Sequence, residues 1–182
     1  MRKEPPRLEI LITKNAFIFF GKAIYKEFAD RLPLSGSEQV LDFGSGMGTV
    51  AYYVAKRLPQ GNLTCQDISE RWLSACRKTL KRYKNVTITD ADAADLPAGN
   101  FDVVYCHFVL HEIADSELAS TIPALARALK QGGYLVFKEP LAEADKLRLI
   151  KKLVCDSGLT FRSGRVTDLP FMGNALECVY TK

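Results

Sequence analysis

The first regular pattern in the chain is an apolar residue at every third or fourth position of segment 16–32. This spacing puts the apolar side chains on one side of a helix, so it predicts an amphipathic helix that Pro33 ends. The apolar positions are Phe17, Phe20, Ile24, Phe28 and Leu32.

After residue 38, short apolar runs alternate with segments of helical spacing. Such runs predict buried strands, and strands that alternate with helices of this length predict a parallel sheet with right-handed crossovers. The expected strands are 39–43, 63–65, 86–89, 101–106 and 134–137, and the expected helices are one that ends near Leu58, then 69–84, 116–129 and 142–156.

Two further strand-like runs follow, 160–165 and 176–180. The connection between them contains Pro170 and Gly173, which favours a turn, so the two runs predict an antiparallel pair at the edge of the sheet. The expected fold class is therefore α/β, with a Rossmann-like doubly wound, mostly parallel seven-stranded sheet and helices on both faces.

The length and charge of the chain favour one domain of moderate charge. The 182 residues are 47% apolar, which is enough for one substantial core. We expect a single domain with an N-terminal tail and helix in 1–34, a cofactor-binding core in 35–140, and a C-terminal helix and edge hairpin in 141–182. The formal net charge is only +4, and the densest basic segments, 71–84 and 146–152, lie in expected helices. Basic residues there favour a solvated helix face, so nucleic acid is not an expected partner.

The cysteines and the start of the sequence bear on metal binding and location. The five cysteines show neither a C-x-x-C motif nor close pairing, so we expect no metal site and interpret them as small buried side chains in a reducing compartment. Segment 10–12 is apolar but too short for a signal sequence, and no apolar run reaches the length of a membrane span. We therefore expect a cytoplasmic protein without a membrane partner.

A glycine-rich turn follows the first expected strand, in the sequence Val40-Leu41-Asp42-Phe43-Gly44-Ser45-Gly46-Met47-Gly48. Glycines at this spacing let the backbone turn tightly and approach a ligand without an intervening Cβ. A dinucleotide-binding loop has its third glycine three residues after the second, but Thr49 occupies that position here. The spacing therefore argues against a dinucleotide as the ligand.

Three acids recur at the expected strand ends. Asp42, Asp67 and Asp92 are 25 residues apart, which is close to the length of one strand–helix unit. Because ligands of open α/β sheets bind beyond the carboxyl ends of the strands, we expect these acids to lie near one another and near a ligand. An acid after the second strand, where Asp67 stands, can accept hydrogen bonds from two ribose hydroxyls.

Together these motifs resemble those of the class I S-adenosylmethionine-dependent methyltransferases. The glycine loop is similar to the family's first motif, 65–69 to its ribose-binding segment, and 92–97 with 101–104 to its third motif. Segment 126–136 is similar to the passage from a helix into the fifth strand, with Gln131 where proline is more usual. The resemblance covers residues 39–140, and a terminal antiparallel strand pair is common in the family.

The resemblance implies S-adenosylmethionine as the cofactor and a role for each matching residue. The Asp42 side chain would help to hold the methionine end, while the backbone at Gly44, Ser45 and Gly46 makes the close approach. The remaining implied roles are ribose binding by Asp67, an apolar surface for adenine at Ile68, an acceptor for the adenine amino group at Asp92, and a backbone contact to an adenine ring nitrogen at Ala93. Asp90 is the alternative to Asp92, because a shift of register by one or two residues would exchange them.

The fourth expected strand ends in Tyr105-Cys106-His107-Phe108, which lacks the Asp/Asn-Pro-Pro-aromatic motif of amino-directed nucleic-acid methyltransferases. His107 and His111, the only histidines, follow this strand and are the candidate general bases. In the alternative interpretation, which we favour, His107 lines the cofactor pocket, and His111 with Glu112 forms hydrogen bonds or caps a nearby helix.

Two further segments have open interpretations. The first helix is rich in aromatic residues and is the candidate lid, with Phe19 or Tyr25 facing a small acceptor or a partner. Segment 138–140 at the end of the fifth strand either orients an acceptor or forms the turn into a helix.

The expected activity is methyl transfer from S-adenosylmethionine to an unidentified acceptor, a small molecule in preference to a protein, with S-adenosylhomocysteine as the product. Two alternatives are a noncatalytic S-adenosylmethionine-binding module or partner subunit, and an NAD(P)-dependent oxidoreductase. Thr49 and the terminal strand pair count against the oxidoreductase. The sequence specifies no oligomeric state.

Overall fold

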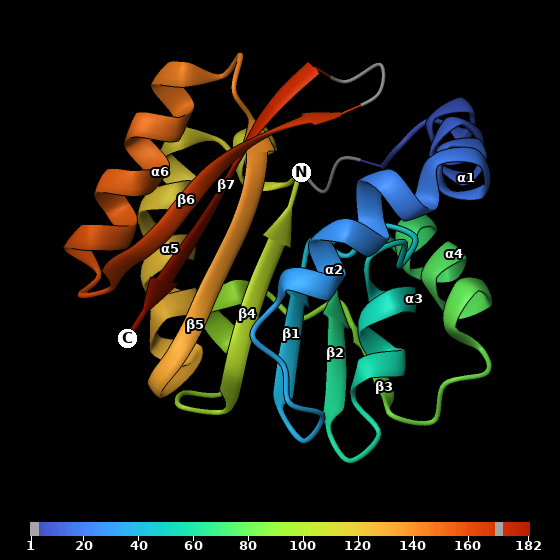
Figure 1. Cartoon of the computed structure of the whole chain (residues 1–182), viewed down its shortest axis with the longest axis horizontal. Coiled ribbons are helices and arrows are strands. Elements are labelled where there is room, and N and C mark those ends of the chain that lie inside the picture. Colours follow the sequence, from blue (N-terminus) through green and yellow to red (C-terminus); the bar gives the residue numbers. More distant parts are fainter. Residues whose placement is uncertain (1–3, 170–172) are drawn as a thin grey trace. The chain divides into compact units, whose positions relative to one another are not determined.

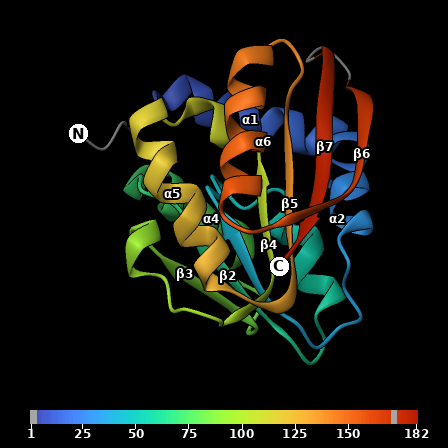
Figure 2. The same cartoon turned by 90° about the vertical axis from the view of Figure 1, so that its left-hand side faces the viewer.

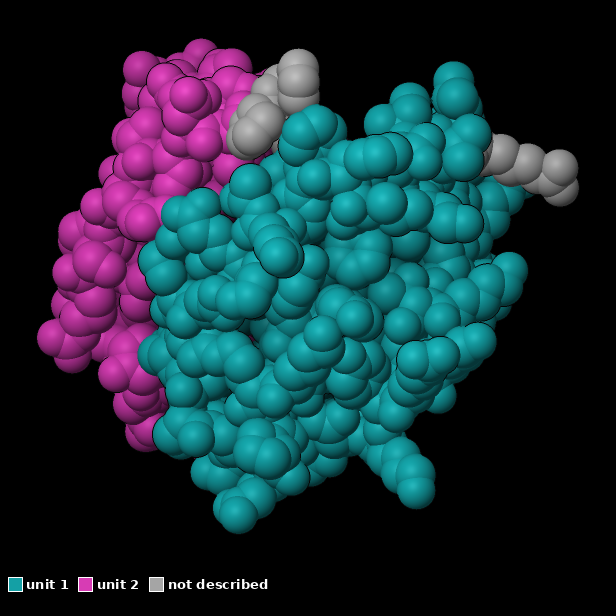
Figure 3. All heavy atoms as spheres, turned by 45° about the vertical axis from the view of Figure 1, so that its right-hand side comes forward, with its two compact units in different colours: residues 1–91 teal, residues 92–182 magenta. Residues whose placement is uncertain are grey.

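The computed structural model describes residues 4–169 and 173–182. Their contacts cluster into two compact units, residues 1–91 and residues 92–182, which Figure 3 draws in teal and magenta. Each unit is described by itself below. The single-domain organisation expected from the sequence stays a prediction.

Unit 1 contains three parallel strands in the order β3-β2-β1. They are β1 (Gln39–Phe43), β2 (Asn62–Gln66) and β3 (Val86–Thr89), close to the expected ranges (Figure 1). The register pairs Phe43 with Gln66 and Gln66 with Thr89. The three carboxyl ends therefore lie level with one another, which is the arrangement that brings loop residues of successive strands together.

The helical segments of unit 1 are α1 (Arg7–Gly21), a π-helical turn (Lys22–Lys26), α2 (Glu27–Arg31), α3 (Ala51–Val54) with a 3-10 turn (Ala55–Arg57), and α4 (Glu70–Leu80). Of these helices, α3 packs against β2 and α4 against β3. Helix α3 contacts both α2 and α4. The expected helix 16–32 thus begins earlier, at Arg7, and α4 ends before residue 84. Ser69 caps α4 as expected, since its hydroxyl accepts a hydrogen bond from the amide of Trp72 at 3.2 Å.

The apolar stripe of the first helix faces the core only in its second half. Ile24, Phe28 and Leu32 are buried, whereas many apolar side chains of α1 lie in solvent, with Phe19 75% exposed. Phe17 is the inward aromatic of α1, and its ring lies 5.5 Å from that of Tyr52 in an edge-on arrangement. Helix α1 therefore packs on unit 1 over a narrow contact and leaves an apolar outer face.

Unit 2 contains four strands in the order β4-β5-β7-β6. Strand β4 (Phe101–His107) runs parallel to β5 (Leu129–Pro140), and β7 (Gly173–Thr181) runs antiparallel to β5 and to β6 (Thr160–Leu169). The expected terminal antiparallel pair is confirmed, while Pro170 lies outside the described residues. Helices α5 (Asp115–Ala128) and α6 (Ala144–Asp156) pack against each other on these strands (Figure 2).

Among residues 4–169 and 173–182, no helix is both long and apolar enough to cross a membrane.

Candidate functional site

The glycine loop leaves β1 through three left-handed residues. Gly44, Gly46 and Gly48 have φ values of 73°, 53° and 77°, a region that disfavours residues with a Cβ. The amides of Gly44 and Ser45 donate hydrogen bonds to the carbonyl oxygen of Gln66, at 2.9 and 2.8 Å. The loop therefore folds back over the end of β2, and the predicted side-chain-free turn is present.

Asp67 fastens this loop to the start of α4. Its Oδ2 accepts a hydrogen bond from the amide of Gly46 and its Oδ1 from the amide of Ser69, both at 2.9 Å. The residue is 8% exposed, and burial raises the pKa of its carboxyl, although the two amide donors act in the opposite direction. Each carboxylate oxygen has a further lone-pair direction, so Asp67 can still accept hydroxyl donors from a ligand.

Gly46 and Gly48 have different surroundings in the loop. A Cβ on Gly48 would lie 3.0 Å from the Cys76 sulfur and 3.1 Å from a Leu80 methyl, so this glycine permits close packing on α4. A Cβ on Gly46 would meet nothing within 4 Å, so the middle of the loop faces open space. Within the described part of the chain, the buried hydroxyl of Ser45 has no hydrogen-bond partner. An open backbone and an unpaired buried hydroxyl fit a site for a polar ligand.

The residues beside the loop add an acid and an apolar surface. Asp42 is 2% exposed near the end of β1, and Ile68, directly after Asp67, is 43% exposed. The structure therefore brings six of the predicted cofactor residues together at the carboxyl ends of β1 and β2. These are Asp42, Gly44, Ser45, Gly46, Asp67 and Ile68.

Three predicted cofactor residues belong to unit 2, and their roles stay predictions. Asp92 is exposed and precedes the 3-10 turn Ala93–Asp95, whereas Asp90, its alternative, is exposed in unit 1. His107 is the last residue of β4.

Sequence reasoning missed the part that Glu4 takes in the first unit. Its carboxylate accepts hydrogen bonds from the Ser69 hydroxyl at 2.7 Å and from the amides of Glu70 and Arg71 at 3.2 and 3.3 Å. The Ser69 hydroxyl bond, together with the amide bonds, lowers the pKa of Glu4. Glu4 is thus a second cap of α4, placed next to Asp67, and no local pattern in the sequence signals it.

His107 is half-buried at the end of β4, with its imidazole turned away from solvent. Burial lowers the pKa of its imidazole to about 3, so the ring is neutral at physiological pH. The next residue, Phe108, has φ 57°, a strained value for a bulky side chain, and its ring lies edge-on to His107 at 4.7 Å. A neutral, enclosed imidazole suits a wall of a pocket better than it suits proton transfer near neutral pH.

His111 is held by Glu139, the residue before the end of β5. The Glu139 side chain is fully buried and lies 2.5 Å from His111 Nδ1. Burial would lower the pKa of His111, but the hydrogen bond and the charge of Glu139 raise it. The alternative interpretation gave His111 and Glu112 a hydrogen-bonding or capping role, and the hydrogen-bond partner of His111 is Glu139.

Glu139 also holds the backbone that follows β4. Its carboxylate accepts hydrogen bonds from the amides of Val109, Leu110 and His111, at 3.1, 2.8 and 3.4 Å. Residue Glu139 therefore positions the loop that carries His111, a role that the open interpretation of segment 138–140 did not include.

A metal site in the described ranges would need a cluster of side chains that could bind the ion. There, no group of three or more His, Cys, Asp or Glu side chains could hold a metal ion.

Comparison with known proteins identifies the family of this chain. Residues 40–133, more than half of the chain, match the family model described as "Methyltransferase domain". A trans-aconitate 2-methyltransferase of Paracidovorax citrulli is 31% identical over 132 residues, which cover 66% of this chain and 50% of that protein. A demethylmenaquinone methyltransferase of Tropheryma whipplei is 34% identical over 110 residues, covering 59% of this chain and 44% of that protein.

Solved structures agree on the fold. The crystal structure of a SAM-dependent methyltransferase from Aquifex aeolicus superimposes with a TM-score of 0.69 at 21% identity, covering 90% of this chain and 91% of that one. The Rossmann-like fold expected from the sequence is thereby confirmed. The chain spans about half the length of the curated relatives that it matches. The family match, the glycine loop and the acid that fastens it lead to one conclusion: this chain belongs to the class I S-adenosylmethionine-dependent methyltransferase family.

Proposed function

We propose that the protein transfers the methyl group of S-adenosylmethionine to a small-molecule acceptor and releases S-adenosylhomocysteine. The observation that carries the proposal is the link between Gly46 and Asp67, which holds an open glycine backbone beside a buried acid. Membership of the methyltransferase-domain family supports the choice of donor.

The residues of unit 1 fit the parts of the donor. Asp67 would accept the ribose hydroxyls through lone pairs that the two amides leave available. Ile68 would support the adenine ring, and the loop backbone with Asp42 and the Ser45 hydroxyl would hold the methionine end. In unit 2, the family resemblance assigns the adenine amino group to Asp92, an adenine ring nitrogen to the backbone of Ala93, and a wall of the cofactor pocket to His107.

The donor supplies an activated methyl group when it is bound, so the protein needs chiefly to orient the two reactants and exclude water. His111 is the candidate base. Its imidazole is half-buried and fixed through Nδ1 by Glu139, which leaves Nε2 as the nitrogen that could take a proton. His107 would serve as a neutral part of the wall, because burial keeps its pKa low.

A small molecule is the favoured acceptor. The names of the two relatives given above point to trans-aconitate and demethylmenaquinone, both small molecules. A ribosomal protein L11 methyltransferase of Pelobacter propionicus, 32% identical over 126 residues, is named for a protein acceptor, so the labelling experiment below includes both classes of acceptor.

Two measurements test the proposal and separate it from its alternatives. Calorimetric titration should show saturable binding of S-adenosylhomocysteine and none of NAD; binding of NAD alone would overturn the donor. Incubation with methyl-labelled donor and a metabolite extract, then a protein extract, should move label into the metabolite fraction. Donor binding without any label transfer would favour the noncatalytic module instead.

A further inference from the structure

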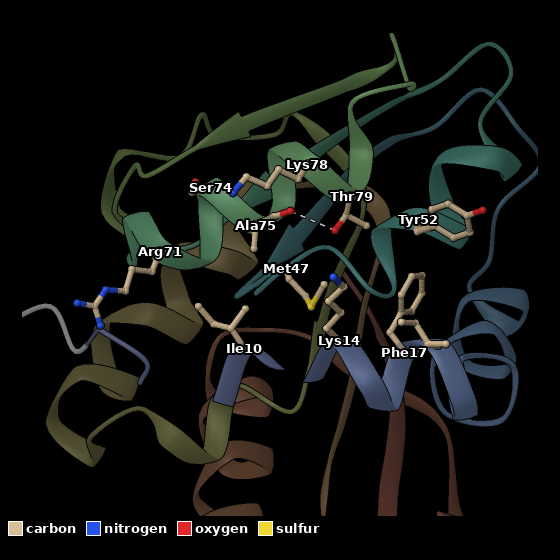
Figure 4. Close-up of a pocket in the computed structure, with 11 residues that line it drawn as sticks. Ile10, Lys14, Phe17, Met47, Tyr52, Arg71, Ser74, Ala75, Lys78 and Thr79 are labelled. Carbon is tan, nitrogen blue, oxygen red and sulfur yellow. Dashed lines mark hydrogen bonds between the residues drawn. The ribbon is translucent and has the colours of Figure 1, made fainter. Parts of the chain in front are cut away.

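A cavity of about 740 Å³ opens beside the glycine loop in unit 1, within the size range of small-molecule sites (Figure 4). Helix α1 forms one wall and helix α4 the opposite one, and Met47, between the last two glycines of the loop, points in from the loop. The lining residues are Ile10, Lys14, Phe17, Ile18, Met47, Tyr52, Arg71, Ser74, Ala75, Lys78 and Thr79.

The charges of this lining are all of one sign. Lys14 comes from α1, Arg71 and Lys78 come from α4, and the described lining contains no acid. Arg71 donates a hydrogen bond to the carbonyl of Pro5, but Lys14 and Lys78 form no hydrogen bond or ion pair with any described residue. Two lysines without counter-charges on facing walls create a site that attracts an anion.

Some other basic residues of the same unit are paired with acids. Lys26 binds Asp30, and Arg77, one residue before Lys78, binds Glu70. Sequence analysis interpreted the basic residues of 71–84 as one solvated face. The structure divides them, because Arg77 pairs with Glu70 at the surface, whereas Arg71 and Lys78 are lining residues of the cavity.

The rest of the lining is apolar. Ile10, Phe17, Met47 and Ala75 supply hydrocarbon, sulfur and aromatic surface between the lysines. The hydroxyl of Thr79 is engaged, since it donates to the carbonyl of Ala75 at 3.1 Å. Such a lining suits an apolar body that carries one acidic group, because apolar burial and charge pairing act on different parts of the same molecule.

We propose that this cavity binds a small amphipathic organic acid, whose carboxylate is attracted by Lys14 and Lys78 and whose apolar body lies against Phe17 and Met47. The inference concerns binding alone and stands apart from methyl transfer. A ligand here would contact Met47, and therefore the loop that the donor is proposed to use.

Octanoate serves as the probe ligand for this cavity, and octanamide, which has the same apolar chain without the charge, is the neutral control. We expect saturable binding of octanoate to one site by calorimetry, weakened by added salt, and binding of octanamide at least tenfold weaker. Lys14→Gln and Lys78→Gln should each reduce octanoate affinity about fivefold, as for a partly exposed charge pair. Lys84→Gln, an exposed lysine outside the lining, is the control and should leave the affinity unchanged.

A second variant tests the cavity rather than its charge. Ala75→Phe places a large side chain in the lining and should abolish octanoate binding while S-adenosylhomocysteine still binds. In the unsubstituted protein the Met47 methyl resonance should shift on addition of octanoate.

Three results would overturn the proposal. They are equal affinity for octanoate and octanamide, unchanged octanoate affinity in both Lys14→Gln and Lys78→Gln, and no octanoate binding by a protein that binds S-adenosylhomocysteine. The last result would leave the proposed methyl transfer intact, so the two proposals fail separately.

Discussion

The amide of Gly46 donates a hydrogen bond to the carboxylate of Asp67, so the middle glycine of the loop and the acid after β2 hold each other in place. One oxygen of the same carboxylate thus fixes the loop, while the other receives the amide of Ser69 at the start of α4. The proposed ribose acceptor is therefore also part of the loop's own framework.

Replacement of Asp67 should weaken donor binding, because it removes both the proposed ribose acceptor and the hydrogen bond that holds Gly46. Asp67→Ala removes a charged hydrogen-bond acceptor, typically worth about 1.5 to 3 kcal/mol, so the affinity for S-adenosylhomocysteine should fall at least tenfold in a calorimetric titration. Asp156→Ala, which removes a surface partner of Lys152 in unit 2, is the control and should bind normally. Unchanged affinity in Asp67→Ala would refute the ribose assignment.

Gly48 and Gly99 form a matched pair for separating backbone strain from packing. Both have a positive φ, 77° and 60°, but only at Gly48 would a Cβ meet close neighbours. Gly99→Ala should cost about 1 to 2 kcal/mol of unfolding free energy, and Gly48→Ala a further 1 to 3 kcal/mol from overpacking against α4. Urea unfolding of both variants checks this, and equal losses would contradict the packing role.

The pair of His111 and Glu139 should make stability depend on pH. The pKa of folded His111 is raised, so its contribution is complete below the unfolded pKa and is lost as the pH rises through the folded pKa. His111→Gln should therefore lose more stability at about pH 5.5 than at about pH 8.5. Urea unfolding at the two pH values measures the difference.

A control for this pH effect is Lys130→Gln, which breaks an ion pair with Asp102 that involves no histidine. Its loss of stability should be similar at both pH values. If His111→Gln lost the same amount at both, the ion pair with Glu139 would not be formed in solution.

Turnover by the same variant tests the candidate base. If His111 takes a proton from the acceptor, His111→Gln should lower kcat by about 100-fold or more and remove an ionisation from the pH profile. A variant that retains kcat would leave His111 with a structural role only, which is the interpretation favoured by the sequence.

Thiol labelling should distinguish one cysteine from the other four. Cys155 is exposed, whereas Cys65, Cys76, Cys106 and Cys178 are buried, which corrects the expectation that all five are buried. Burial also raises the pKa of Cys178 to about 11, so its thiolate is scarce. A maleimide should add one label quickly under native conditions, and Cys155→Ser should abolish that step; a second fast label would show that a buried site opens.

The strands and the loop could be predicted because their signals are local. The apolar run at Val40–Leu41 and the glycine repeat next to it are enough to predict a buried strand followed by a tight turn. Ser69 likewise caps the helix that it directly precedes. Strand β5 was expected to begin only at Tyr134, because Gly132 and Gly133 resemble a turn. In the structure Leu129 already pairs with Phe101, and the register shifts before Tyr134 pairs with Val103.

The missed features depend on residues far apart in the sequence. Glu4 meets the start of α4, and Glu139 meets the backbone at Val109 to His111, so nothing near either acid indicates its partner. The unpaired lysines of the cavity are a similar case. Lys14 and Lys78 look like ordinary surface residues until α1 and α4 place them on facing walls.

The hydrogen bonds that the Glu139 carboxylate accepts from the segment after β4 should slow hydrogen exchange in that segment. The backbone amides of a loop that follows a strand usually exchange their protons quickly, because they form hydrogen bonds with water instead of with a neighbouring strand. Here the amide of Phe108 donates to the carbonyl of Lys138, and the next three amides donate to the Glu139 carboxylate. Four successive amides beyond β4 should therefore exchange as slowly as a strand, and a single side chain accounts for three of them.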